Sequence, residues 1–526
     1  MPNPKILLAT VAVAFVATFS ACGGSDTSTI DRGTVIRNVT VVDTRNGALA
    51  PGRNVVVADG RIQQVTDQPV EVTGSAQAID AGGRYLVPGF LDMHTHLLNA
   101  SPAERPLIQK LLVANGITGI REMGGAPDWI AQVRQHNADR AAGATIAPEI
   151  LQIPGQIIGI PPTGIPSFDV GAPAEAMVSA SAAAATVRAQ KAGGVDFVKT
   201  IAANREAALG LLVEAKLSGL DVAGHLTPWV SALEASAGGW RAIEHLGGGG
   251  GLMLDCSSDE AAVRADVLAG AAGSPPALPA NWTSAPAAAP LYQRLVDTFD
   301  ADKCRTLASS FALHGTWQVP TLVRIRTGLF AEEAQYQADP DLIYVSKSTR
   351  AAWLTAAQQR AAAYSPAQLA SYHAFYERAR TLPLLFKSRG VKMLAGSDMS
   401  INPFLTATWV VPGASLHREF QLLADAGLTP LDVLQMTTLN GAQFLRRESR
   451  MGTVEPGRNA DLVLLDADPL QGVANLGRIA GVFQGGRYFP KEALAQMKAE
   501  VAAAYEAASA TAPASTADHA RVLHVH

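Results

Sequence analysis

The sequence has little net charge and no long apolar run, and each of these two features argues against a class of protein. Only 17% of its 526 residues are charged, and 42 Lys and Arg stand against 46 Asp and Glu, a net charge of −4. So small an imbalance gives no reason to expect nucleic acid as a partner. Hydrophobic residues make up 48% of the chain, which is a globular rather than a disordered composition. The apolar run from Ile6 to Phe19 is too short to cross a bilayer as a helix.

The first residues predict export. Lys5 precedes the apolar run, and this combination is typical of a signal peptide. The run ends in residues 19–24, Phe-Ser-Ala-Cys-Gly-Gly, which resemble the lipobox of bacterial lipoproteins, where the cysteine is acylated and becomes the mature N-terminus. We therefore expect a lipoprotein signal peptide over residues 1–21, lipidation of Cys22 and a flexible tether over residues 22–33. The protein would then be periplasmic or on the cell surface, held at the membrane by its lipid anchor. An ordinary secretory signal with an incidental cysteine is the alternative, and it also predicts export.

Cysteine is scarce, with three in the whole chain. Apart from Cys22, only Cys256 and Cys304 remain. Export places both in an oxidising compartment, where they can form a disulfide that ties down the Pro- and Ala-rich stretch 271–290. Two free buried thiols are the alternative, and the sequence does not choose between them.

Both ends of the mature chain have the pattern of short strands and turns. Such runs occur over residues 34–88, where Ala58 to Ile62 has the pattern of a hairpin, and again over residues 450–490. Neither piece has enough strands for a core of its own, so we predict that the two form one small β-sandwich accessory domain. Residues 491–526 are expected to form a C-terminal helix, over 491–507, followed by a disordered tail.

Between these pieces, apolar β-type runs alternate with Ala- and Leu-rich helical stretches, which is typical of parallel βα units. Helices are expected over residues 174–192, 205–217 and 365–380, the last with Ser365 as its N-cap and Pro366 at its first position. Eight β-type runs can be counted, namely Tyr85 to Asp92, Ile117 to Glu122, Glu149 to Ile153, Val195 to Ile201, Asp221 to Gly224, Ala242 to Glu244, Trp317 to Leu322 and Val391 to Ala395. The fold class is therefore predicted to be α/β, with an eightfold (β/α) TIM barrel over residues 89–449.

The first candidate site residues lie in residues 89–96, Gly-Phe-Leu-Asp-Met-His-Thr-His. Positions i and i+2 of a strand face the same way, so His94 and His96 project together from the C-terminal end of the first strand. Barrel enzymes bind their substrates at that end. Imidazole suits zinc and similar ions, but a catalytic metal needs about three protein ligands or more. Further ligands must therefore come from other strands.

Four residues at the ends of other predicted strands complete the candidate set. Of the eleven histidines, only His225 and His245 join the first pair at such positions. Asp398 closes the last strand in the same way. Lys199 ends the fourth strand after apolar residues, where a buried ammonium is costly without a task or a partner. A structural lysine paired with a carboxylate is the alternative interpretation.

With these residues and several further segments, the sequence resembles the amidohydrolase superfamily from about Val35 to Phe489. It is most similar to the imidazolonepropionase-like and prolidase-like branch, which includes exported dipeptidases. Glu122, at the end of the second strand, departs from the pattern, because similar sequences carry Asp there. The further shared segments are residues 116–125, 416–419, 426–430 and 451–463, the last being similar to the return of the family's chain into its β-domain.

The resemblance implies a binuclear metal site. Carried over residue by residue, it assigns His94, His96 and Asp398 to one divalent cation and His225 and His245 to a second, with Lys199 bridging both. Because a protonated amine cannot be a ligand, the bridge requires N6-carboxylated Lys199, a carbamate formed with carbon dioxide. Two zinc ions per chain are expected, although these ligands also accept other divalent ions. Asp398 is the expected catalytic residue, which takes a proton from the metal-activated water and passes it to the leaving nitrogen.

The expected function is that of a metal-dependent amidohydrolase that cleaves a carbon-nitrogen bond of a small-molecule amide. The resemblance favours a dipeptide or an N-acyl amino acid as substrate. A mononuclear cyclic-amide hydrolase or deaminase is the alternative if Lys199 is not carboxylated. A non-catalytic exported binding lipoprotein is the alternative from another class, but all six expected positions are filled, which disfavours it.

Other polar residues of the barrel region are expected to have structural roles. His417 and Glu419 belong to the helix that follows the last strand. His136, His314 and His373 fall in predicted helices, where surface or packing positions are more common than ligands.

Overall fold

The computed structural model describes residues 28–159, 176, 178–201, 203–269, 285–401 and 408–511. The predicted signal peptide, Cys22, most of the tether and residues 512–526 of the predicted disordered tail lie outside the described residues, as does the greater part of the stretch 271–290. Residues 508–511 of that tail continue the C-terminal helix. Within the described ranges, no helix combines the length and the apolar character that crossing a membrane requires.

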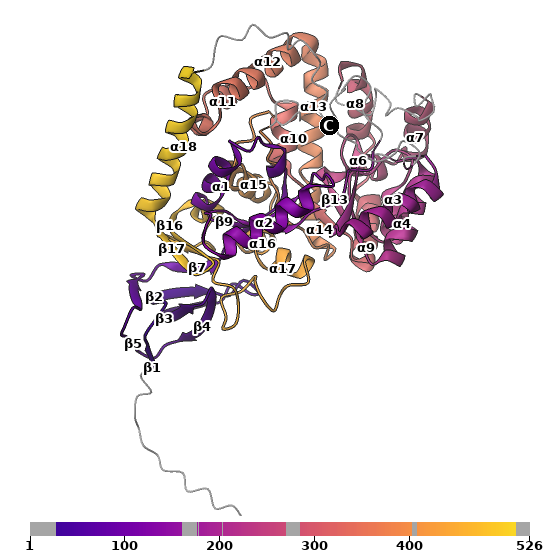
Figure 1. Cartoon of the computed structure of the whole chain (residues 1–526). Coiled ribbons are helices and arrows are strands. Elements are labelled where there is room, and N and C mark those ends of the chain that lie inside the picture. Colours follow the sequence, from indigo (N-terminus) through magenta and orange to yellow (C-terminus); the bar gives the residue numbers. More distant parts are fainter. Residues whose placement is uncertain are drawn as a thin grey trace, which may run out of the picture.

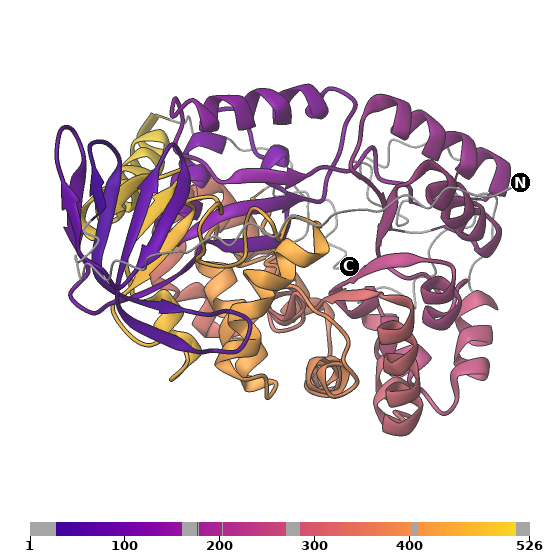
Figure 2. The same cartoon turned by 90° about the horizontal axis from the view of Figure 1, so that it is seen from below.

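One end of the molecule is an eight-stranded sheet that combines both ends of the chain (Figure 1). Viewed from below, the indigo N-terminal strands and the yellow C-terminal strands stand side by side (Figure 2). The strand order is β17-β16-β15-β7-β2-β3-β4, with β6 beside β2, while β1 and β5 pair separately. The strands are β1 (Ser28–Ile30), β2 (Thr34–Val42), β3 (Leu49–Ala58), β4 (Arg61–Thr66), β5 (Val70–Val72), β6 (Gln77–Asp80), β7 (Tyr85–Pro88), β15 (Leu462–Leu465), β16 (Ile479–Gln484) and β17 (Arg487–Pro490). A separate accessory domain with two facing layers stays a prediction.

Glycines decide where the chain turns and where it changes sheet. The predicted hairpin is present, because β3 and β4 pair antiparallel around Asp59 and Gly60, both with positive φ. The predicted strand Tyr85 to Asp92 is divided at Gly89 into β7, in the first sheet, and β8 (Phe90–Thr95), which pairs with a parallel neighbour. A Cβ at Gly89 would lie 2.1 Å from Thr118 Oγ1. Only glycine therefore lets the backbone cross from one sheet to the other at this point.

The parallel strands form two sheets in chain order. One has the order β10-β9-β8 and the other β11-β12-β13-β14. Isolated parallel bridges join Pro154 to Phe197 and Ile158 to Thr200, between the strand β10 region and β11. These strands are β8, β9 (Ile117–Glu122), β10 (Glu149–Gln152), β11 (Phe197–Thr200), β12 (Asp221–Gly224), β13 (Trp240–Glu244) and β14 (Trp317–Val319). Seven of the eight predicted parallel strands are thus present, in the predicted order.

The eighth predicted strand, Val391 to Ala395, is wrong as a strand. Bridges pair Met393 with Gln318 on one side, and Met399 with Thr95 on the other. The backbone N–H of Met93 donates to the carbonyl of Ala395, but the N–H of Ala395 donates to Met436, outside the sheet. Because the N–H of Ala395 is bonded to Met436, it does not pair with β8, and the hydrogen bonds between β8 and this segment are interrupted. The segment lies between β14 and β8 without continuous pairing, and a closed barrel stays a prediction.

Apolar side chains from seven of the eight segments, with Met123 directly after β9, meet in one buried cluster. It contains Leu91 and Met93 of β8, Phe197 of β11, Trp317 of β14 and Leu394 of the eighth segment. Leu151, Ala223 and Ala242 from the remaining strands belong to the same cluster. Alternate residues of these short strands therefore face a common interior, while the others pack against helices in the largest core.

Helices connect the parallel strands and cover them (Figure 1). They are α1 (Arg105–Ala114), α2 (Trp129–Ala141), α3 (Ala180–Gly193), α4 (Arg205–Ser218), α5 (Ala232–Ala237), α6 (Gly251–Asp255), α7 (Glu260–Ala269), α8 (Ala289–Asp297), α9 (Ala301–His314), α10 (Leu322–Leu329), α11 (Ala334–Gln337), α12 (Lys347–Ala363), α13 (Pro366–Ala379), α14 (Leu382–Ser388), α15 (Ala414–Asp425), α16 (Pro430–Met436), α17 (Leu439–Phe444) and α18 (Lys491–Thr511). Helix α13 has the predicted Ser365 cap and Pro366 start. Helix α18 confirms the predicted C-terminal helix and packs against α1 through Leu111, Val501 and Tyr505.

Candidate metal centre

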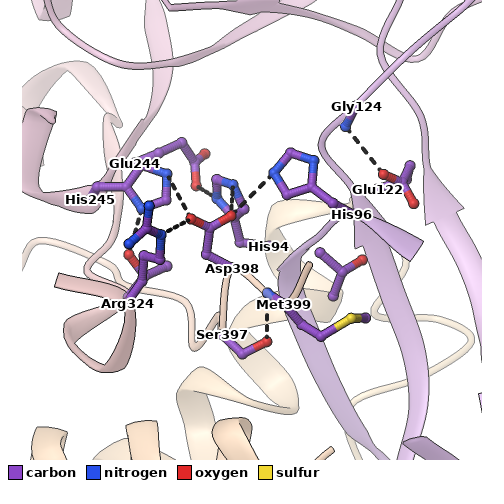
Figure 3. A network of polar contacts seen from close by, with 12 residues as sticks. His94, His96, Glu122, Gly124, Glu244, His245, Arg324, Ser397, Asp398 and Met399 are labelled. Atoms are coloured by element: carbon purple, nitrogen blue, oxygen red, sulfur yellow. Dashed lines mark hydrogen bonds and ion pairs between the residues drawn. The ribbon is translucent and has the colours of Figure 1, made fainter. Parts of the chain in front are cut away.

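Four of the six predicted ligands converge on one point. Asp398 Oδ1 lies 3.1 Å from His96 Nε2 and 3.2 Å from His94 Nε2. The other oxygen, Oδ2, lies 3.9 Å from His245 Nε2. Figure 3 shows the carboxylate of Asp398 with the three imidazoles around it. Ligand atoms of His94, His245 and Asp398 all lie within 4.8 Å of one another.

The ring of His94 is oriented by a buried carboxylate. Glu244 Oε2 lies 2.7 Å from His94 Nδ1, and Glu244 Oε1 accepts a 2.6 Å hydrogen bond from Arg121. Glu244 and Arg121 are both fully buried. Burial alone would raise the pKa of Glu244, but the charge of Arg121 and the hydrogen bond to His94 outweigh it and hold the pKa at about 2. The ionised carboxylate therefore keeps the proton of His94 on Nδ1 and leaves Nε2 as an acceptor facing Asp398.

The ring of His245 is oriented in the same way by a hydroxyl. Thr321 Oγ1 lies 2.6 Å from His245 Nδ1. Thr321 immediately precedes α10, and its side chain does not cap that helix. Instead, Glu419 of α15 accepts a 2.7 Å hydrogen bond from the backbone N–H of Val323. A carboxylate from a neighbouring helix thus satisfies the start of α10 and frees Thr321 to hold His245.

Asp398 is fixed by contacts on its backbone and on its carboxylate. The buried Asp92 accepts hydrogen bonds from the backbone N–H of Ser397 at 2.9 Å and from its hydroxyl at 2.5 Å. Arg324 of α10 donates from Nε to Asp398 Oδ2 at 3.1 Å. Burial would raise the pKa of Asp398, but its contacts with the surrounding imidazoles of His94, His245 and His96 keep it well below its ordinary value. Asp398 is therefore an ionised and immobilised carboxylate.

Three residues of the centre have a left-handed backbone. The φ values are 54° for His245, 45° for Thr321 and 54° for Asp398. For a residue with a side chain this conformation costs roughly 1–2 kcal/mol. Such strain persists only where the surrounding contacts impose it, and it concentrates at functional sites.

His225 and Lys199 lie beside these residues on neighbouring strands. The rings of His225 and His245 are 4.8 Å apart and perpendicular. The N–H of His225 donates to the carbonyl of Thr200, next to Lys199 on β11. Lys199 is only 1% exposed. Burial lowers its pKa to about 8, although the charges of Glu244 and Asp398 act in the opposite direction. A lysine with that pKa is neutral far more often than an exposed one, as carbamate formation requires.

The donors present fit a divalent cation. His94 Nε2 is buried and has no hydrogen-bond partner among the described residues, although Asp398 Oδ1 is close. An imidazole lone pair and a carboxylate oxygen 3.2 Å apart repel each other unless a proton or a cation lies between them. His94, His96 and Asp398, which we call the first side, would share one cation. We call Lys199, His225 and His245 the second side. The two histidines supply imidazole nitrogens next to the first side, and a carboxylated Lys199 would supply oxygen.

The glycine-rich loop after β13 shapes the second side. Residues 247–251 are all glycine, and each except Gly250 has positive φ. A Cβ at Gly248 would lie 3.0 Å from His225 Nδ1. The loop leads into α6, after which Cys256 forms a disulfide with Cys304 of α9. Of the two alternatives for these cysteines, the structure has the disulfide, and it ties the segment behind the second side to the core.

The remaining predicted residues have the structural roles expected of them. Glu122 accepts hydrogen bonds from the N–H groups of Leu98 and Gly124, so it orders the loops around His96 without contacting a predicted ligand. His417 lies on α15, and its Nε2 donates to the carbonyl of Asn115. His136, His314 and His373 lie on α2, α9 and α13.

Sequence reasoning missed the residues that orient the ligands. Glu244 carried a usable signal, because it is a carboxylate at the end of an apolar strand, the same argument that singled out Lys199. Arg121 carried the same kind of signal, since it is a charged residue at the end of the strand β9. Thr321, Arg324 and Asp92 carried no signal, because their contacts join segments far apart in the sequence.

Known proteins share parts of this sequence. Residues 375–488, which include Asp398, match the model of the amidohydrolase family. Imidazolonepropionase from Desulfotalea psychrophila is 30% identical over 101 residues, 18% of this chain and 24% of that protein. Adenine deaminase from Rubrobacter xylanophilus is 42% identical over 64 residues, 12% of this chain and 11% of that protein. The chain thus matches about a quarter or less of the length of these two relatives.

Solved structures match over most of the chain. A bottromycin amidohydrolase has a TM-score of 0.64 and 23% identity, with 90% of both chains covered. A putative prolidase from Bifidobacterium longum has a TM-score of 0.59 and 21% identity, with 90% of this chain and 99% of that chain covered. At these identities the likeness shows a shared mixed α/β fold. Together with the family match, it confirms the resemblance to the amidohydrolase superfamily that the sequence predicted.

Proposed function

We propose that this protein is a metal-dependent amidohydrolase that cleaves the carbon-nitrogen bond of a small amide, a dipeptide or an N-acyl amino acid. The observation that carries the proposal is the convergence of His94, His96 and His245 on Asp398. Two of these imidazoles are held through Nδ1 by a further side chain, so that Nε2 is directed at the carboxylate. A centre built only for stability would not need four such groups around one point, two of them, His245 and Asp398, with a left-handed backbone.

In this proposal each residue of the centre has a definite task. The six predicted ligands, with Lys199 carboxylated, would hold divalent cations, two zinc ions in this proposal, and such cations would activate a water molecule and polarise the substrate carbonyl. Asp398 accepts the proton of that water and delivers it to the leaving nitrogen. Arg324 keeps Asp398 in position through Oδ2, so Oδ1 remains directed toward His94 and His96. Glu244 and Thr321 prevent His94 and His245 from rotating.

The architecture around the site is part of the proposal. We infer that the two parallel sheets and the segment 391–399 close into a (β/α)8 barrel, with the composite sheet as its accessory domain. The support is the backbone hydrogen bonds that join Met93 of β8 to Ala395 and Leu394 to Gln318 of β14, and the common apolar interior. Export as a lipoprotein anchored through Cys22 completes the proposal. Its support is the N-terminal sequence alone.

A mononuclear cyclic-amide hydrolase or deaminase is the second candidate. The adenine deaminase and imidazolonepropionase relatives favour it, because their matched segments have higher identity than the prolidase has over its full length. In that case Lys199 would remain an uncarboxylated lysine beside a single cation. The two candidates therefore differ in metal stoichiometry and in the state of Lys199.

Metal analysis of the purified protein tests the proposal. We expect two equivalents of divalent metal in the wild type and a clear loss in Lys199→Ala, while Lys191→Ala, an exposed lysine on α3, retains both. Recovery of activity after chelation should need bicarbonate as well as metal, because carbon dioxide forms the carbamate. One equivalent in the wild type, with recovery independent of bicarbonate, would support the mononuclear candidate. Protein that binds no metal would overturn both.

A further inference from the structure

An apolar pocket opens beside the second side of the candidate metal centre. His245 forms part of its wall, together with Leu246 and two glycines of the loop after β13. The rest of the wall comes from four helices, α6, α8, α10 and α13. The side chains there are Met253, Tyr292, Ile325, Leu329, Phe375 and Ala379.

Apart from the imidazole of His245, the wall of this pocket has no side chain that could neutralise a charged group. None of its residues is acidic, and none is a lysine or an arginine. Met253, Tyr292, Leu329, Phe375 and Ala379 are all buried. A carboxylate or an ammonium placed here would lose its hydration without gaining a partner, which costs several kilocalories per mole. An aliphatic group would gain the burial of its apolar surface.

The pocket is small and its floor is rigid. Its cavity volume is about 30 Å³, more than the roughly 10–15 Å³ that holds one water molecule and much less than an aromatic ring needs. Tyr292 and Phe375 form the floor, with ring centroids 4.6 Å apart in an edge-to-face arrangement. Tyr292 also contacts the ring of Tyr372 at 4.6 Å. These packed rings cannot move aside easily for a larger group.

The pocket is also next to the chemistry. His245 belongs both to the pocket wall and to the metal centre, and Ile325 follows Arg324, which holds Asp398. A side chain seated in the pocket would therefore belong to a substrate whose scissile bond lies at the metal centre.

We propose that this pocket binds a short, uncharged aliphatic group of the substrate, of the size of a methyl to an isopropyl group, adjacent to the bond that is cleaved. This inference rests on the proposed function and narrows the substrate class to amides of small aliphatic residues such as Ala and Val. Phe375 and Ala379 set the size limit. The ring of Phe375 closes the floor of the pocket, and the small side chain of Ala379 leaves room for the substrate group.

A substrate panel on the metal-loaded full chain tests the proposal. The panel varies one side chain through Gly, Ala, Val, Leu, Phe, Asp and Lys, first on the acyl side and then on the amine side of the amide. In the wild type, kcat/KM for Ala or Val should exceed that for Phe, Asp and Lys by about 10-fold or more in one of the two series, as expected when a pocket accepts or rejects an apolar group.

Two variants change the pocket in opposite directions. Ala379→Leu fills it and should lower the ratio of kcat/KM for Val to kcat/KM for Gly by about 10-fold or more. Phe375→Leu enlarges it and should shift the preference toward Leu. Ala370→Leu, at an exposed position of the same helix, is the matched control and should change neither preference. Equal effects on all side chains, or a wild type that prefers Asp or Lys in both series, would overturn the inference.

A binding measurement separates this inference from the proposed function. Isobutyramide should raise the melting temperature of the metal-free wild type and not that of Ala379→Leu, whereas succinate should affect neither. If no panel member is turned over but isobutyramide still discriminates between the two proteins, the proposed function fails and the pocket remains. If the wild type is active but Ala379→Leu and Phe375→Leu change neither the substrate preference nor the effect of isobutyramide, the pocket assignment fails and the proposed function remains.

Discussion

The two sides of the candidate metal centre are held in place by different means. On the first side, His94 and Asp398 are oriented by buried charged groups, Glu244 with Arg121, and Asp92. On the second side, His225 and His245 depend on a hydroxyl, a glycine loop with positive φ and a disulfide behind it. The first side is therefore organised by buried ionic contacts before any metal binds, whereas the second relies on a hydroxyl, on glycines and on the state of Lys199.

Helix α10 connects the two sides. Thr321 before it contacts His245, and Arg324 within it contacts Asp398. Glu419 from α15 holds the start of this helix. A displacement of α10 would therefore disturb both sides together, while changes at Glu244 or at the disulfide should affect one side more than the other.

The largest expected effect comes from Asp398 itself. Asp398→Asn should lower kcat on any substrate found by about 10²–10⁴-fold, because an amide cannot take up and deliver the proton. Asp425→Asn, an exposed position on α15, is the control and should retain full activity. Circular dichroism must show an intact fold in both variants. Turnover that survives in Asp398→Asn would remove Asp398 from the mechanism.

The buried charges of the first side predict the next effect. Glu244→Gln leaves Arg121 buried without its counter-charge and should lower the free energy of unfolding by about 3–5 kcal/mol. It should also weaken metal binding by about 10–100-fold, since His94 loses its orienting group. Glu234→Gln removes an exposed carboxylate from Arg205 and should cost about 0.2–1 kcal/mol. Urea denaturation and titration with Zn²⁺ measure both quantities. If both variants lost the same free energy of unfolding, the burial of Glu244 would not be the cause of the predicted destabilisation.

Loss of the disulfide should have a smaller and more local effect. Cys256→Ala combined with Cys304→Ala should lower the free energy of unfolding by about 2–4 kcal/mol, because the unfolded chain is no longer constrained. The wild type with a reducing agent should behave like the double variant. Peptide mapping without reductant checks the starting point, and two alkylatable thiols there would contradict the bond.

The last expected effect is a dependence of stability on pH. Burial raises the pKa of Glu419 from 4.5 to about 8. Between these values the folded state keeps a proton that the unfolded state has lost, so this group's contribution to stability is greatest at low pH and falls as pH rises toward 8. Glu419→Gln keeps an acceptor for Val323 but does not titrate. The free energy of unfolding of the wild type relative to this variant should therefore decrease between about pH 5 and pH 8. A difference that does not change with pH would show that Glu419 is ionised in the fold.

The ends of the parallel strands were predictable from the sequence because their signals are local. The pattern His-x-His, a lysine after an apolar run and the positions of His225, His245 and Asp398 all lie within single strands or just after them. Seven parallel strands and the capped helix α13 followed from the same kind of information. The eighth strand did not, because the N–H of Ala395 donates to Met436, and that competition cannot be read from residues 391–395.

By itself, the sequence determined which residue types are available at the candidate centre. It also determined the apolar runs that form strands, and so which of these residues lie at strand ends. Only the tertiary structure decided how they are oriented. Glu244 reaches His94 across 150 positions of the chain, and Asp92 reaches Ser397 across 305. The apolar pocket is likewise assembled from four helices that no sequence pattern links. Hydrogen bonds and packing act over a few ångströms of space, so they depend on contacts that form only after the chain has folded.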